Sequence, residues 1–322
     1  MKFRFKQTRL KTVVLLICAC LILIGALCLL HHAETQMDQP ASPQSSVHDS
    51  GKPANADVET ILVMGLDKYE KDLEDLGYLN DQQADFLMLL ILDRQAQTCD
   101  LLHLNRDTMT EIHRLGVGGG EAGTYVGQLC LAHTYGSGGS DSCINTAKAV
   151  SGLLDGIRID HYVSVTLDAI GIINDLAGGV TVKLMDDFTD IDPAMVQGKN
   201  VCLNGDQATA YVRSRGSLED KTNLHRMERQ RQYMNALSRR VLECQKEDDH
   251  FLAKAIMKIN GYFTSDYTSN QLNALADEIE SYTFGPIHTL KGKAVQGEKF
   301  TEFYVDEDSL EQTLDELFPG RE

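Results

Sequence analysis

The chain has 322 residues and a formal net charge of −17 at pH 7, with 47 acidic against 30 basic side chains. Domains that bind DNA or RNA usually carry a basic face, so this acidity argues against nucleic acid as a partner. The sequence also contains no helix-turn-helix or zinc-finger spacing and no internal repeat.

Basic residues at the N-terminus precede an uninterrupted apolar run, Val13–Leu30. A helix of this length spans about 27 Å, close to the hydrocarbon thickness of a bilayer. Because basic residues flank only its start, the positive-inside rule predicts a cytoplasmic N-terminus (1–12), a transmembrane anchor (13–30) and an extracellular C-terminal part at the plasma membrane. A cleaved signal peptide shares this beginning and stays the alternative, although the apolar run is longer than usual for one.

Residues 31–56 are polar, hold three of the six prolines and lack apolar periodicity. This composition predicts a disordered linker. Beyond it, apolar runs of strand length alternate with helical patterns. The predicted strands cover residues 59–65, 85–93, 99–104, 161–166, 180–184 and 299–305, and the predicted helices cover 144–154, 167–177, 204–212, 223–238, a stretch after 251 and 309–317. Such alternation predicts a layered α/β or α+β domain.

Several charged residues fall near the ends of predicted strands, where ligand crevices of such sheets lie: Asp67, Asp85, Arg106 and Asp107. We expect Asp67 and Asp85 to share a divalent cation, because Mg²⁺ prefers carboxylate oxygens and also contacts substrate phosphates. Each aspartate taken alone is more simply a turn or helix-cap residue. Their combination with an arginine cluster favours phosphoryl-transfer chemistry.

That cluster consists of five arginines in nineteen positions, against the acidic balance of the chain: Arg213, Arg215, Arg226, Arg229 and Arg231. The planar guanidinium donates in pairs to phosphate oxygens. The nearby acids Glu219, Asp220 and Glu228 are too few to neutralise all five. The cluster therefore predicts a phosphate or pyrophosphate site rather than a solvated helix face.

Cys130 and Cys143 bracket a loop rich in glycine and serine, residues 134–142. In an extracellular protein this spacing predicts a disulfide, and unpaired thiols are the alternative. Zinc is not indicated, because no paired cysteine motif is present.

Taken together, the motifs resemble those of the LytR-CpsA-Psr family of membrane-anchored cell-wall enzymes. The resemblance covers roughly residues 57 to 240 in order and spacing. It is carried by ILVMGLD with QADFLMLLILD, LNRDT, IDHYVSV with LAGGVTV, LNGDQATAYVRSR and NLHRMERQRQ. It implies a three-layer α/β/α domain with a mixed central sheet, over residues 57–245, and a long apolar groove for a polyprenyl tail. Residues 246–322 are then a C-terminal helical and strand portion that packs on this domain.

The resemblance also implies roles for individual residues. Asp67 and Asp85 match metal-binding acids for Mg²⁺ or Mn²⁺. Arg106 and Asp107 match the catalytic pair. The residues that match the pyrophosphate grip are Arg106, Arg213, Arg215, Arg226 and Gln230. Asp107 acts as a base or orients Arg106, and the second role is favoured because a carboxylate paired with arginine is a weak base.

This chain departs from the family pattern at several positions. Gln83 stands where an arginine is usual, and Asn105 stands in place of the proline before Arg106. Asn223 replaces an aspartate, and Gln128-Leu129-Cys130 replaces Lys-Ile-Asn. These changes leave open a divergent subfamily, a different carrier or a reduced activity.

The resemblance implies an extracytoplasmic phosphotransferase that moves a glycopolymer from a polyprenyl-pyrophosphate carrier to peptidoglycan. A non-catalytic binder of polyprenyl phosphate is an alternative, motivated by Gln83 and Asn223. A membrane-bound transcription attenuator, suggested by the family's historical naming, is disfavoured by the predicted outward topology and by the acidity.

Overall fold

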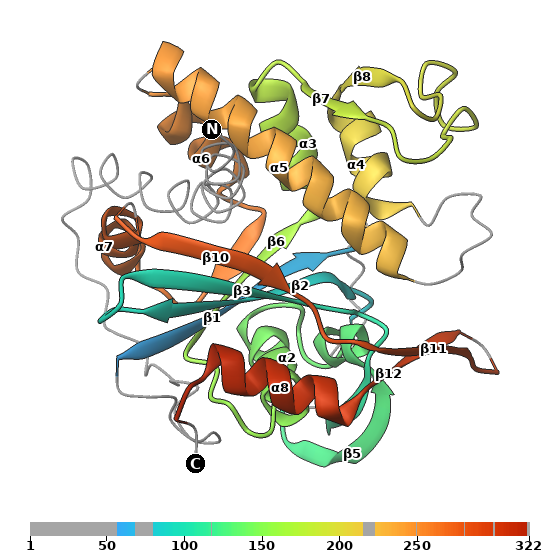
Figure 1. Ribbon diagram of the computed structural model, residues 1–322, viewed down its shortest axis with the longest axis vertical. Helices are drawn as coiled ribbons and strands as arrows, with labels where there is room; N and C mark the ends of the chain where they lie inside the picture. Colours follow the sequence, from blue (N-terminus) through green and yellow to red (C-terminus); the bar gives the residue numbers. More distant parts are fainter. Residues whose placement is uncertain are drawn as a thin grey trace, which may run out of the picture. The chain divides into compact units, whose positions relative to one another are not determined.

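The computed structural model describes residues 57–67, 80–116, 118–214, 223–248, 250–279, 281–298 and 300–320 (Figure 1). The predicted anchor and linker lie outside these residues. Within the described part, no helix combines the length and the apolar character needed to cross a bilayer.

The described residues form two compact units. We call residues 57–166, 263–266 and 285–320 the sheet unit, and residues 167–262 and 267–284 the helical unit. Segments from both sides of residue 245 enter each unit. The predicted boundary at residue 245 separates a family domain from a C-terminal portion, which is a different division from these compact units. That boundary stays a prediction.

The sheet unit is built on a six-stranded sheet of order β10-β3-β2-β1-β6-β9. Its strands are β1 (Val58–Leu66), β2 (Ala84–Asp93), β3 (Thr98–Leu104), β6 (His161–Thr166), β9 (Phe263–Ser265) and β10 (Thr283–His288). β1 runs antiparallel to β2 and parallel to β6, so the sheet is mixed. This confirms the prediction of an α/β fold with a mixed central sheet.

The central strands are apolar along their length because both of their faces are covered, as β2 illustrates with its buried residues from Leu87 to Leu92. Two helices, α2 (Ser140–Leu153) and α8 (Glu307–Leu317), contribute to the same apolar core as β1, β2 and β3. Figure 1 shows both helices on one face of the sheet.

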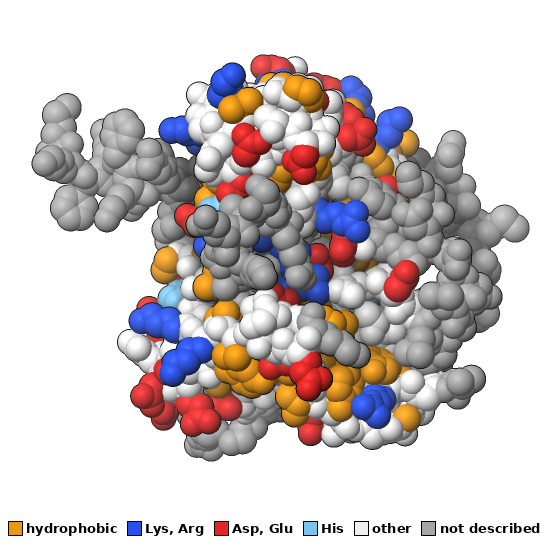
Figure 2. Space-filling view, turned by 90° about the vertical axis from the view of Figure 1, so that its right-hand side faces the viewer, with side chains coloured by type: hydrophobic (Ala, Val, Ile, Leu, Met, Phe, Trp, Pro, Cys, Tyr) orange, Lys and Arg blue, Asp and Glu red, His pale blue; other side chains and the backbone are white. Residues whose placement is uncertain are grey.

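Two hairpins complete the sheet unit. The first joins β4 (Met109–Leu115) to β5 (Glu121–Gln128) and leads into the 3-10 helix η2 (Leu129–Thr134), and the second joins β11 (Gly292–Gln296) to β12 (Thr301–Val305). The turn of the first hairpin is rich in glycine, with positive φ at Gly118 and Gly119. Figure 2 shows hydrophobic side chains on the side of the sheet unit that carries β5, β11 and β12. The exposed large hydrophobic residues of the two hairpins include Val126, Val295, Phe300 and Tyr304.

The helical unit contains α3 (Leu167–Leu176), β7 (Val180–Lys183), β8 (Asn200–Leu203), α4 (Gly205–Arg213), α5 (Asn223–Glu247), α6 (Phe251–Ile259) and α7 (Ser269–Ile279). After α3 the chain turns at Gly178 and Gly179, both at positive φ, where glycine is favoured. α4 begins with a capping box between Asn204 and Gln207. A Cβ at Gly205 would lie 2.8 Å from the backbone oxygen of Gly171, so glycine permits the close packing of α3 and α4.

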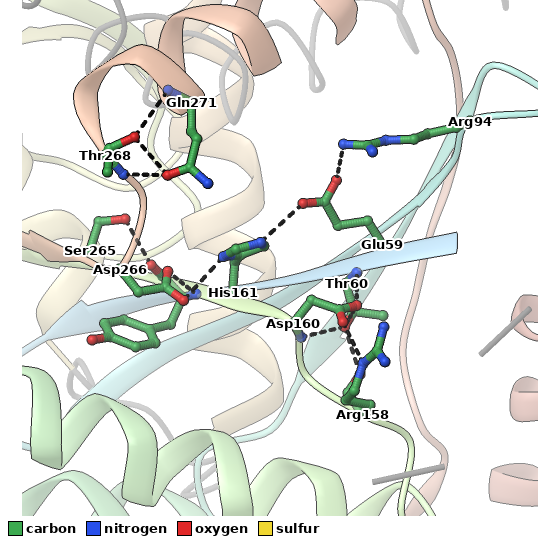
Figure 3. Close-up of polar contacts among 11 residues, drawn as sticks. Glu59, Thr60, Arg94, Arg158, Asp160, His161, Ser265, Asp266, Thr268 and Gln271 are labelled. Atoms are coloured by element: carbon green, nitrogen blue, oxygen red, sulfur yellow. Dashed lines mark hydrogen bonds and ion pairs between the residues drawn. The ribbon is translucent and has the colours of Figure 1, made fainter. Parts of the chain in front are cut away.

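A histidine between two carboxylates fastens the short edge strand β9 to the sheet unit (Figure 3). His161 Nδ1 lies 3.1 Å from Asp266 Oδ2, and His161 Nε2 lies 3.3 Å from Glu59 Oε1. Asp266 also accepts a hydrogen bond from the backbone N–H of Tyr162. Glu59 in turn pairs with Arg94. The imidazole therefore joins β1, β6 and the residue after β9.

We expect His161 to make the stability of the sheet unit depend on pH. Burial by itself lowers the pKa of His161. The hydrogen bond and charge of Asp266, with the charges of Glu59 and Asp160, outweigh burial and raise the pKa above its usual value. Such a histidine contributes its full stabilisation below the pKa of the unfolded chain, about 6.5, and this stabilisation is lost as the pH rises through the higher folded pKa.

The free energy of unfolding in urea should therefore be lower for His161→Gln than for wild type, and this difference should be larger at about pH 6 than at about pH 9. His250 is exposed, so His250→Gln should match wild type at both values. If His161→Gln and wild type differ in unfolding free energy by the same amount at both pH values, the charge of His161 does not stabilise the sheet unit.

Candidate functional site

Asp67, Asp85, Arg106 and Asp107 form what we call the sheet-end site. Asp67 follows the last residue of β1, and its backbone N–H donates to the carbonyl oxygen of Gln83 over 2.8 Å. Asp85 is the second residue of β2, whose first residue, Ala84, pairs with Leu66 of β1. The antiparallel pairing thus brings both aspartates to one end of the two strands, as the sequence predicted.

Arg106 lies two residues beyond β3 and is only 4% exposed. Its Nη1 donates to Asp85 Oδ1. Its Nη2 donates to Gln83 Oε1 over 2.5 Å and to Cys130 Sγ over 2.9 Å. Its Nε lies 3.3 Å from Asp107 Oδ1. Protein groups therefore accept hydrogen bonds from Nη1 and Nη2, whereas Nε is close to Asp107 without forming a hydrogen bond.

The turn after β3 fixes the backbone of this pair. The side-chain oxygen of Asn105 accepts a hydrogen bond from the N–H of Asp107 over 3.0 Å, and the carbonyl of Asn105 accepts one from Thr108. This side-chain turn restrains the chain as a proline would by fixing its φ angle. The departure at Asn105 therefore keeps Arg106 and Asp107 in a defined turn.

The charges of the sheet-end site favour a cation. Asp85 and Asp107 are both buried and both pair with the one guanidinium of Arg106, so this cluster is formally negative before Asp67 is counted. Among the described residues, no group of three or more His, Cys, Asp or Glu side chains is arranged to hold a metal ion. Mg²⁺ is commonly held by one or two carboxylates with substrate phosphates completing its shell. The magnesium site expected at Asp67 and Asp85 stays a prediction.

The predicted pyrophosphate residues outside the sheet-end site belong to the helical unit. Arg213 is the exposed last residue of α4, and Arg226 and Gln230 are buried on the first turns of α5. Gln230 Nε2 donates to the carbonyl of Val212 over 3.3 Å, so the start of α5 lies against the end of α4. Arg226 Nε donates to Asn223 Oδ1 over 2.7 Å. The structure thus places Arg226 and Gln230 on a helix whose start contacts the end of α4, where Arg213 lies, while Arg215 lies outside the described residues.

Asn223 also explains one departure from the family pattern. An aspartate there would place a negative charge against Arg226, whereas the asparagine oxygen accepts the Nε–H without adding charge. The positive charge of Arg226 is therefore not balanced by residue 223.

Arg229 has a structural role that the sequence did not indicate. It is fully buried, and its Nη1 lies 2.8 Å from Asp186 Oδ2, while Nη2 donates to the carbonyl of Ser214. The guanidinium lies over the rings of Phe188 and Tyr211. The expectation that nearby acids could not neutralise the cluster missed Asp186, because it lies 43 residues away in the chain.

The predicted disulfide between Cys130 and Cys143 is wrong: both residues are buried thiols. Cys130 accepts a hydrogen bond from Arg106, whereas Cys143 donates to Ser164 Oγ over 3.4 Å and lies 3.7 Å from His133 Nε2. The two thiols therefore contact different polar neighbours. Of the intervening residues, 131–134 belong to η2 and 140–142 to α2, which leaves only 135–139 between the two helices.

We expect alkylation of the native protein to label exposed Cys202 quickly and to leave Cys130 and Cys143 unmodified until denaturation. Burial raises the pKa of Cys143 to about 12, so its reactive thiolate is scarce. Mass mapping without reductant should find both residues as alkylated thiols after unfolding. A peptide pair linked through these two residues would contradict the structure.

Three further residues surround the sheet-end site. Gln83 and Cys130 contact Arg106, and Gln128 Nε2 donates to Asp107 Oδ1 over 3.0 Å. In the sequence, Gln83 and Gln128 had stood out only as departures from the family pattern, and Cys130 also as a predicted disulfide partner. No residue of β12 had been singled out, although Phe303 N donates to the carbonyl of Asp107 over 2.9 Å.

Comparison with known proteins agrees with the resemblance seen in the motifs. The model of the LytR_cpsA_psr family matches residues 28–318. The polyisoprenyl-teichoic acid–peptidoglycan teichoic acid transferase TagU of Bacillus licheniformis is 26% identical over 269 residues, which cover 82% of this chain and 78% of that protein. TagU of Halalkalibacterium halodurans is 31% identical over 178 residues, or 55% of this chain, and there the chain spans about half (51%) of the relative's length.

Among solved structures, TagV of Bacillus subtilis superposes with a TM-score of 0.56 at 22% identity, covering 83% of this chain and 100% of that chain. This likeness concerns the fold.

Proposed function

This chain belongs to the LytR-CpsA-Psr family, and we propose that it is a transferase that moves a glycopolymer from a polyprenyl-pyrophosphate carrier to peptidoglycan during cell-wall assembly. The observation that carries the proposal is the buried Arg106 beyond the end of β3, held between Asp85 and Asp107. The names of the TagU relatives, as teichoic acid transferases, support the same reaction class.

In this reaction an acceptor hydroxyl oxygen attacks the phosphorus that bears the glycan. A new oxygen–phosphorus bond forms, the bond to the bridging oxygen breaks, and polyprenyl phosphate leaves with that electron pair. The hydroxyl proton passes to solvent. Negative charge grows on the phosphate oxygens, and preorganised donors aimed at them stabilise it.

Each set of residues has a defined part. Arg106 offers a guanidinium whose orientation Asp85 and Asp107 fix in advance, so little reorganisation is needed when charge develops. The resemblance also assigns pyrophosphate binding to Arg213, Arg226 and Gln230 of the helical unit and to Arg215, which lies outside the described residues. Asp67 and Asp85 would hold Mg²⁺, which when bound neutralises charge on the phosphate oxygens.

We further propose that residues 13–30 anchor the protein in the plasma membrane, with the domain outside. The carrier is a membrane lipid, so an anchored domain meets its substrate at the bilayer surface. Protease added to intact protoplasts should remove the domain, and its protection would contradict this placement.

The direct test uses the full chain in vesicles that contain a polyprenyl-pyrophosphate-linked saccharide, with peptidoglycan and Mg²⁺ added. We expect release of polyprenyl phosphate and attachment of the saccharide to peptidoglycan, both abolished by a chelator. Binding of the carrier with no release under any of these conditions would contradict the proposal.

A non-catalytic binder of polyprenyl phosphates is a second candidate, favoured by two contacts of Arg106. Gln83 Oε1 and Cys130 Sγ occupy Nη2 of Arg106, which a phosphate would otherwise use. The vesicle assay separates the two candidates, because a binder retains the carrier without releasing polyprenyl phosphate. A transcription attenuator would require the domain in the cytosol, which the protoplast experiment tests.

A further inference from the structure

Gln128 is a buried amide at the end of β5 that connects two distant parts of the sheet unit. Its Nε2 donates to Asp107 Oδ1 over 3.0 Å and to the backbone carbonyl of Thr301 over 2.9 Å. Both hydrogens of the amide nitrogen are thus used, one on each side.

The acceptor on the second side belongs to β12, which also contacts the Asp107 turn directly. Phe303 N donates to the carbonyl of Asp107 over 2.9 Å, and Phe303 forms an isolated parallel bridge with Thr108. Phe303 is buried, whereas Val295, Phe300 and Tyr304 of the same hairpin are exposed. The hairpin therefore has one attached side, at Phe303, and exposed apolar side chains elsewhere.

Asp107 contacts both Gln128 and the guanidinium of Arg106. The oxygen that accepts from Gln128, Oδ1, is the same one that lies 3.3 Å from Arg106 Nε. A continuous series of polar contacts then runs from the carbonyl of Thr301 through Gln128 and Asp107 to Arg106. All four residues belong to the sheet unit.

We propose that Gln128 is a positioning residue that fixes Asp107, and through it the guanidinium of Arg106, against the C-terminal strand β12. The inference rests on the proposed function for its effect on turnover. It assigns β12 to the reacting site, although β12 lies more than 170 residues from Asp107 in the chain.

The chemistry of the side chain explains why a donor with two hydrogens is needed at this position. Asp107 Oδ1 and the carbonyl of Thr301 are both acceptors, so a carboxylate at residue 128 would face two acceptors and repel Asp107. A methionine would fill a similar volume without donating. A lysine, which the resembled family carries here, donates up to three hydrogens and can serve both acceptors.

The test compares Gln128→Glu, Gln128→Met and Gln128→Lys in the full chain, by kinetics and by NMR of ¹⁵N-arginine-labelled protein. The Nε–Hε signal of Arg106 is assigned from its loss in Arg106→Lys. Partners that orient a functional side chain typically contribute about 10–100-fold. We expect the Glu and Met variants to lose kcat by that factor with KM within about threefold of wild type, and to shift the Arg106 signal.

The Lys variant should keep the turnover and the Arg106 signal of wild type. A purely structural role of Gln128 would not require this. Should Gln128→Glu fail to fold, Gln128→Met decides by the same criteria. An unmoved Arg106 signal in a folded Glu or Met variant overturns the proposal. If wild type itself shows no turnover, the proposed function fails, and the Arg106 signal alone still decides whether Gln128 positions it.

Discussion

Replacing Arg106 by lysine is expected to lower glycopolymer transfer by about 100-fold or more while the protein stays folded. Loss of one preorganised donor to a developing oxyanion costs about 10²–10³ in kcat, and an ammonium cannot reproduce the planar fork that contacts Asp85, Gln83 and Cys130. Lysine keeps the positive charge between Asp85 and Asp107, so most of the stability should remain. Release of polyprenyl phosphate and thermal unfolding measure the two effects.

The alanine variant is expected to lose stability as well as activity. Arg106 and its two carboxylates are all buried. Removing the guanidinium leaves uncompensated buried charge, which costs about 3–5 kcal/mol.

For the lysine variant, Arg94→Lys is the matched control, since that arginine is half exposed and pairs with Glu59. Wild-type turnover in Arg106→Lys would contradict the role given to Arg106.

Replacing Asp186 by alanine should have the largest effect on stability in the helical unit. Asp186 Oδ2 pairs with Arg229 and Oδ1 lies 2.8 Å from His225 Nε2, and both carboxylate and guanidinium are buried. Breaking a buried pair by removing one partner costs about 3–5 kcal/mol. Because burial already lowers the pKa of Arg229, with Asp186 opposing that shift, loss of the carboxylate leaves the guanidinium without its main charge partner.

Denaturant unfolding measures the loss of stability in Asp186→Ala. The control is Asp190→Ala, an exposed acid four residues further on, which should leave the unfolding midpoint unchanged. If Asp186→Ala and Asp190→Ala unfold at the same denaturant concentration, the pair contributes nothing to stability, and Arg229 should be reconsidered as a ligand residue.

The central strands could be predicted from the sequence because their apolar runs are local. The runs 85–93 and 161–166 correspond to β2 and β6 almost residue for residue. The hairpin strands β5 and β11 were missed, since most of their residues are exposed and show no alternation. α5 was predicted to end at Ser238 but continues to Glu247, with Val241 and Cys244 extending its buried stripe.

The site was predictable only in part, for a similar reason. Asp67, Asp85, Arg106 and Asp107 could be placed at strand ends because each lies at the edge of an apolar run. Their partners could not be placed in the same way. Gln128 reaches Thr301 across 173 residues, and Asp186 reaches Arg229 across 43. A pattern read along the chain carries no information about such pairs.

The order of strands in the sheet has a consequence for how the protein is made. Both edges of the sheet, β9 and β10, come from residues after 262, whereas the four inner strands are complete by Thr166. During synthesis, β3 and β6 therefore lack their outer partners while about a hundred further residues emerge, at roughly 5–20 residues per second. Unpaired strand edges of this kind recruit other chains. The nascent chain thus passes through several seconds in which a holding chaperone, or rapid provisional pairing, determines its yield.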